Sequence, residues 1–89
     1  MSMKLIAQIE SFGEAGYLAW IDSIKGMAVQ ADTPEKAVKE LLISLKAKLS
    51  FDLGIKFDDI EAVEEREIKP EEIVTIAGKT QKEINFSFA

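Results

Sequence analysis

The chain has 89 residues, of which 47% are hydrophobic and 30% are charged. This balance suits one packed core and excludes an intrinsically disordered protein. The chain contains no cysteine and no histidine, which excludes disulfides, thiolate metal sites and any mechanism with histidine as the general base. Its net charge of −5 makes a basic protein a better candidate partner than nucleic acid.

The first predicted elements form a meander of three strands. Residues 3–10 alternate apolar and polar side chains, apart from Ile6, which predicts a half-buried strand. Residues 17–21 are aromatic or apolar at every position, as is typical of a central strand, and the glycine-containing turn at 13–16 joins the two in a hairpin. Alternation resumes at residues 27–31, which predicts the third strand.

A helix is predicted after this meander. Thr33 can cap free backbone N–H groups, and Pro34 at the first helical position loses no hydrogen bond. The motif formed by Asp32, Thr33, Pro34 and Glu35 is therefore interpreted as a structural helix cap. Gly54 is a typical left-handed C-terminal cap, which gives a helix of about 20 residues. Its apolar stripe consists of Val38, Leu41, Leu42, Leu45 and Leu49.

The remainder of the chain gives fewer signals. Acidic residues dominate positions 60–68, and residues 70–72 favour a turn or a short helix start. Ile84, Phe86 and Phe88 alternate with polar residues, which predicts a final strand near 82–88 that pairs with the sheet or with a second subunit. We therefore expect one α+β domain over residues 1–89, with a core at 3–54 and a C-terminal extension at 55–89. The expected architecture is an antiparallel sheet of three to four strands with one long helix on one face.

Residues 17–37 resemble the signature of HicB-like proteins. In that family a Tyr-x-Ala strand leads, without gaps, through a Gly-Cys turn into a Gly-Asp-Thr-x-Glu-Glu-Ala helix start. The residues that fall in register here are Tyr17, Ala19, Gly26, Asp32, Thr33, Glu35 and Ala37. The resemblance covers roughly residues 3–53 and implies a partial ribonuclease-H-like β-β-β-α-β fold. It also implies a protein that binds and neutralises a small basic HicA-type toxin that cleaves messenger RNA.

The chain departs from the family pattern in ways that indicate a divergent member. Asp22 and Lys25 stand where the family usually has prolines, while Met27 replaces a cysteine and Ala31 replaces a glycine. Many family members also carry a C-terminal DNA-binding domain that represses their own operon. The acidic stretch after Gly54 has no basic strand or second helix pair for phosphate contacts. We therefore expect no DNA-binding domain and no direct nucleic-acid partner.

Several residues are candidates for an interface with a toxin or a second copy. Strand 17–21 is apolar on both faces, whereas one helix covers only one face of a sheet. Tyr17 and Trp20 are therefore buried inside the chain, in a homodimer or under a toxin, and the first two alternatives are favoured over direct toxin contact. An acidic stretch such as residues 60–68 is more often a solvated face than a docking surface for a basic partner. The further interface candidates are Glu61, Glu64, Glu65, Ile84, Phe86 and Phe88.

A metal-dependent nuclease is the enzymatic alternative. It would require Glu10, Asp22, Asp32 and Glu35 to converge on two metal ions. These acids lie at separate strand ends and in a helix cap, and acidic residues are common throughout the chain. We therefore expect no catalytic residue, no metal site and no cofactor.

The sequence thus predicts a non-enzymatic, cytoplasmic antitoxin-type protein that forms a dimer or a higher homo-oligomer. Its expected partner is a small basic HicA-type toxin. The alternative is a stand-alone homo-oligomeric HicB-like domain with a structural or ligand-binding role and no toxin. No membrane association is expected, because no apolar run reaches the roughly 20 residues that span a bilayer and no signal-peptide pattern is present.

Overall fold

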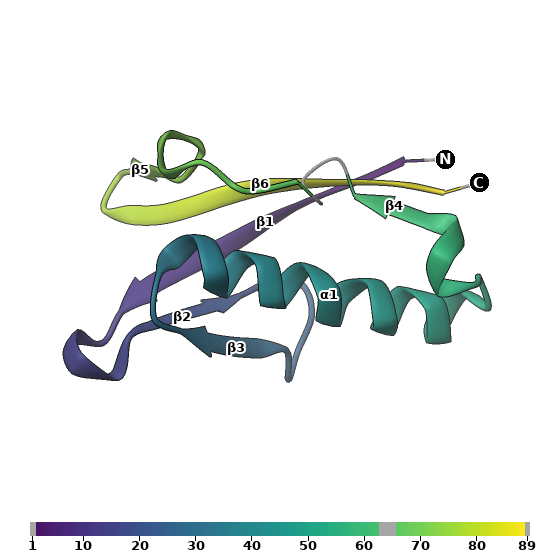
Figure 1. Cartoon of the computed structure of the whole chain (residues 1–89), viewed down its shortest axis with the longest axis horizontal. Helices are drawn as coiled ribbons and strands as arrows, with labels where there is room; N and C mark the ends of the chain where they lie inside the picture. Colours follow the sequence, from purple (N-terminus) through teal and green to yellow (C-terminus); the bar gives the residue numbers. More distant parts are fainter. Residues whose placement is uncertain (1, 63–65, 89) are drawn as a thin grey trace.

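The computed structural model describes residues 2–62 and 66–88 (Figure 1). Within these residues, six strands form one antiparallel sheet, and one α-helix lies against one face of it. The strand order is β3-β2-β1-β6-β4, and β5 also pairs with β6. The predicted α+β class with an antiparallel sheet is confirmed. The predicted three to four strands were too few, because the chain after the helix contributes three strands to the described sheet.

The predicted meander is confirmed. It consists of β1 (Ser2–Ser11), β2 (Tyr17–Trp20) and β3 (Ala28–Ala31), with a short 3₁₀ helix at Gly13–Ala15 in the first connection. Trp20 lies opposite Gln8 of β1 on one side and Ala28 of β3 on the other. This register decides which side chains share a face, because successive residues of a strand point to opposite faces.

Helix α1 (Pro34–Leu53) begins and ends where the caps predict. The backbone N–H of Lys36 donates to Thr33 Oγ1 over 3.2 Å, and Gly54 adopts the left-handed conformation with φ of 66°. Glu35 in the first turn is stabilised by the positive end of the helix dipole. Among the described residues, no helix is long and apolar enough to cross a bilayer.

The C-terminal part of the chain belongs to the same sheet. It contains β4 (Ile60–Ala62), β5 (Val74–Ile76) and β6 (Lys79–Phe88), with short 3₁₀ helices at Phe57–Asp59 and Pro70–Glu72. Strand β6 pairs along its length with β1 of the same chain, from Ser2↔Ser87 to Ile9↔Thr80. β4 and β5 pair with opposite ends of β6, so β6 is an interior strand of the sheet and starts earlier than the predicted 82.

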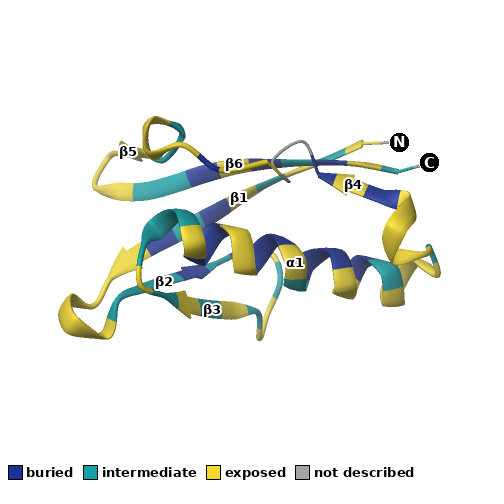
Figure 2. Cartoon of the chain, in the orientation of Figure 1, coloured by how far each residue is buried: buried dark blue, intermediate teal, exposed yellow. Residues whose placement is uncertain are grey.

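The core lies between α1 and the sheet, and buried positions recur along the inner side of the helix and alternate along the strands (Figure 2). The helix packs mainly on β2 and β3. Ile84 and Phe86 of β6 are fully buried in this core, at 0% and 1% exposure. Their predicted role in an interface is therefore corrected, since neither side chain can reach a partner while the chain is folded.

Candidate functional site

The sheet has a second face that α1 does not cover. The strand registers place the even-numbered residues of β1, β2 and β3 and the odd-numbered residues of β6 on this side. We call this surface the open face. Its polar residues interact with one another: Lys4 Nζ lies 3.4 Å from Glu83 Oε1, and Gln81 donates to Gln8 Oε1 over 3.2 Å. The open face is therefore an ordered surface available to a partner.

Apolar side chains lie among the polar residues of the open face. Trp20 and Leu18 of β2 are half-buried, and Ile6 of β1 is 38% exposed. Tyr17, the other aromatic candidate, lies on the opposite side, where it packs against the core. The structure thus separates the two predicted aromatic residues: Tyr17 belongs with the helix side, and Trp20 belongs to the open face.

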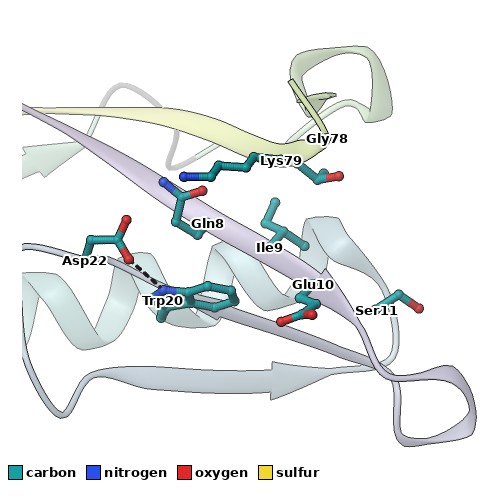
Figure 3. A pocket seen from close by; sticks show the side chains of 9 residues that line it. Gln8, Ile9, Glu10, Ser11, Trp20, Asp22, Gly78 and Lys79 are labelled. Carbon is teal, nitrogen blue, oxygen red and sulfur yellow. Dashed lines mark hydrogen bonds between the residues drawn. The ribbon is translucent and has the colours of Figure 1, made fainter. Parts of the chain in front are cut away.

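A shallow hollow of about 440 Å³ surrounds Trp20 (Figure 3). Gln8 and Glu10 of β1, Asp22 after β2 and Lys79 of β6 contribute to its lining. The indole Nε1 of Trp20 donates a hydrogen bond to Asp22 Oδ1 over 2.9 Å. The hollow therefore combines one aromatic ring, two carboxylates and one ammonium group, which come from three adjoining strands and the turn after β2.

The four acids of the nuclease hypothesis do not converge on one site. Glu10 and Asp22 line the hollow beside Trp20, whereas Glu35 lines a separate hollow with Thr33 at the start of α1. Asp32 is an exposed residue that precedes the helix cap. Within residues 2–62 and 66–88, no three histidine, cysteine, aspartate or glutamate side chains are placed to hold a metal ion. This arrangement lacks the carboxylate cluster that two-metal chemistry uses.

The acidic interface candidates are only partly described. Glu61 is exposed on β4, opposite Ser87 of β6. Glu64 and Glu65 lie outside the described residues, so their predicted role stays a prediction. Phe88 at the end of β6 is half-buried and packs against the core. Among the acidic candidates that lie within the described residues, Glu61 therefore has an accessible side chain.

A buried lysine forms an ionic cluster that sequence reasoning missed. Lys82 is 6% exposed, and its Nζ lies 3.9 Å from Glu72 Oε2 and donates to the carbonyl of Glu83 over 2.5 Å. Arg66 Nη1 lies 2.8 Å from Glu72 Oε1. The available signal was the position of Lys82, which shares the parity of the buried residues Ile84 and Phe86. Glu72 thus connects the segment before β5 to the buried side of β6.

The hydrogen bond from Arg66 lowers the pKa of Glu72 below its ordinary value of 4.5, assisted by the charges of Arg66 and Lys82 and opposed by partial burial. Ionised Glu72 therefore stabilises the folded state above pH 4.5, and this stabilisation is lost as the pH falls through the folded-state pKa. We expect the Tm of the native chain to fall more steeply below pH 4.5 than that of Glu72→Gln. Thermal unfolding over an acid pH series measures this difference, with exposed Glu71→Gln as the control. Parallel curves for the native chain and Glu72→Gln would contradict it.

Comparison with known proteins found no relative of the chain. No family model, curated protein or solved structure matches the chain.

Proposed function

We propose that the chain is a non-enzymatic, HicB-like antitoxin-type protein that binds and neutralises a small basic HicA-type toxin. The observation that carries this proposal is the open face, where Trp20, Leu18 and Ile6 are incompletely buried beside Glu10 and Asp22. Aromatic residues anchor the centres of protein interfaces, and carboxylates complement a basic partner. The residue pattern at 17–37 supports the class of partner.

The order of the first elements supports the fold part of this proposal. A β-β-β-α sequence, formed by β1, β2, β3 and α1, agrees with the beginning of the partial ribonuclease-H-like unit. The family unit ends with one strand after the helix, whereas this chain has β4, β5 and β6 in its described part. We propose that β4 and β5 are additions to the family unit, since each is three residues long and pairs only with β6.

Neutralisation in this proposal requires no chemistry by the chain. A toxin that cleaves messenger RNA must present basic residues to the phosphate backbone. The carboxylates of the open face compete with those phosphates for the same basic residues, and the apolar residues between them exclude water from the contact. Occupation of the RNA-binding surface then blocks cleavage.

A second candidate function, the stand-alone homo-oligomer, is favoured by the edge of the sheet at β3. This strand has the sequence Ala-Val-Gln-Ala, and its outer edge has no strand partner among the described residues. Natural edge strands are commonly protected by charges, prolines or bulges, and β3 has no charge and no proline. Two copies could therefore pair their β3 edges without charge repulsion.

The proposal expects a small basic protein to be encoded next to the chain, and the test is co-expression of the two. We expect the two proteins to copurify and the chain to rescue growth arrest caused by that protein. Trp20→Ala should weaken the complex about tenfold or more, because a central aromatic residue contributes strongly to an interface.

The matched control is Phe51→Ala on α1, at a side chain that is 88% exposed on the other side of the sheet. Phe51→Ala should leave the complex intact. Absence of both copurification and rescue would refute the antitoxin proposal. Sedimentation of the chain alone, with a dimer that dissociates when Val29→Pro interrupts β3, would support the homo-oligomer instead.

A further inference from the structure

We propose that the hollow beside Trp20 binds an arginine side chain, with the guanidinium against the indole ring and between the carboxylates of Glu10 and Asp22. The proposal rests on the proposed function for the source of that arginine, which is the basic partner.

The strand register places Glu10 beside the ring, and the turn after β2 places Asp22 there. Trp20 pairs with Gln8, and Glu10 pairs with Leu18, so Glu10 is the diagonal neighbour of Trp20 on the same face. Diagonal neighbours on a sheet lie about 7–8 Å apart, within reach of long side chains. Asp22 follows Trp20 by two residues and accepts the indole N–H at 2.9 Å. Both carboxylates line the same hollow as the ring (Figure 3).

The hydrogen bond to Asp22 also fixes the ring. With its only N–H donor satisfied, the indole has no competing partner that would rotate it out of position. Ala28, the cross-strand neighbour of Trp20 on β3, is small and exposed, and the amide of Gln30, the diagonal neighbour on β3, donates instead to the carbonyl of Ala15. The hollow is thus a preorganised aromatic surface that opens to solvent.

This combination of groups suits a cation. Tryptophan has the strongest attraction for a cation above its ring, and a carboxylate that accepts one hydrogen bond retains further acceptor sites. Arginine fits better than lysine, because its planar guanidinium can stack on the ring while its N–H groups point sideways towards carboxylates. An anion would face two carboxylates and one ammonium group, which is a net repulsive set.

Removal of the Lys79 charge should affect arginine binding in the opposite direction to removal of a carboxylate. Its side chain lines the hollow from β6, with Gln8 between it and Trp20 (Figure 3). A positive charge at this position repels an incoming guanidinium, so its removal should tighten arginine binding. A role of the hollow in fold stability alone would not produce this improvement.

The experiment follows the indole N–H signal of Trp20 by NMR, which is unambiguous because the chain contains one tryptophan. The probe is the peptide acetyl-Gly-Arg-Gly-amide, titrated into the full chain. Its control is the same peptide with citrulline, which is nearly isosteric with arginine and uncharged. We expect saturable binding of the arginine peptide in the millimolar range and no saturable response to the citrulline peptide.

Charge-removing variants assign the binding to the hollow. Glu10→Gln and Asp22→Asn should each weaken arginine binding about threefold or more, and Lys79→Gln should strengthen it about twofold. Glu83→Gln is the matched control, since it removes the same charge from the open face at a residue paired with Lys4 outside the hollow. It should change binding less than Glu10→Gln does. Thermal unfolding of every variant verifies that the fold is retained.

The outcomes separate this inference from the proposed function. Equal responses to arginine and citrulline, or equal effects of Glu10→Gln and Glu83→Gln, would overturn the arginine site. A complex with the neighbouring basic protein would then still support the antitoxin proposal. Conversely, saturable arginine binding without any complex would uphold the site and leave the antitoxin proposal refuted.

Discussion

Replacement of Phe86 by alanine is expected to lower the free energy of unfolding by about 3–5 kcal/mol. The side chain is 1% exposed and is one of the largest fully buried groups of the core. It lies on β6 opposite Met3, with Ala62 of β4 as its partner on the other edge. Truncation removes contacts to both neighbouring strands and leaves a cavity. Because β6 is hydrogen-bonded on both edges here, the backbone cannot move in to close it.

Urea denaturation followed by circular dichroism measures this loss. Phe51→Ala is the matched control, because it deletes the same atoms from a side chain that is 88% exposed on α1. It should leave the free energy of unfolding unchanged or raise it slightly, since alanine is the better helix former. Small domains have only about 5–15 kcal/mol of stability, so Phe86→Leu provides a milder variant if Phe86→Ala does not fold. Similar losses for Phe86→Ala and Phe51→Ala would contradict the assignment of β6 to the core.

Replacement of Gly16 by alanine is the second change with a large expected effect. Gly16 has φ of 92° and ψ of −144°, a backbone conformation that side chains strongly disfavour. A Cβ at this position would lie 2.5 Å from the carbonyl oxygen of Ala31, at the end of β3. Either the turn or the end of β3 must move, so we expect a loss of about 2 kcal/mol or more.

Gly13 in the same turn provides the comparison. Its φ of 62° is also positive, but no atom within 4 Å would meet an added Cβ. Gly13→Ala should therefore lose only about 1 kcal/mol, the cost of the left-handed conformation itself. The free energies of unfolding of both variants, measured side by side in urea, test this ranking. A loss from Gly13→Ala as large as that from Gly16→Ala would show that close approach to β3 is unimportant.

The parts of the fold that sequence predicted are those with a repeated local signal. Strands β1 to β3 alternate apolar and polar residues or lie between turn glycines, and α1 is marked by Thr33, Pro34 and Gly54 at its ends. The first half of β6 carries no such signal. Residues 79–83 are polar at every position and become a strand by pairing with β1 and β5. β4 and β5 are three residues long, which is too short for periodicity to appear.

The candidate site was predictable only in its individual residues. An apolar second face on strand 17–21 indicated Trp20, and Glu10 and Asp22 were weighed as metal ligands because acids can act in that role. Their placement around one aromatic ring follows from the β1–β2 register and the turn after Trp20, which no residue pattern specifies. Ile84 and Phe86 were misassigned because a strand alternates in the same way whether its apolar side faces a core or a partner.

The pairing of β1 with β6 determines when the sheet can be completed during synthesis. These strands contain the first and the last described residues, and Ser2 lies opposite Ser87. Contacts between such distant residues require closure of a loop that is nearly the whole chain, which slows folding. Until β6 has left the ribosome, the edge of β1 that will pair with β6 exposes unpaired N–H and C=O groups to other chains. The nascent chain is therefore most prone to wrong strand pairing in the interval before β6 becomes available to β1.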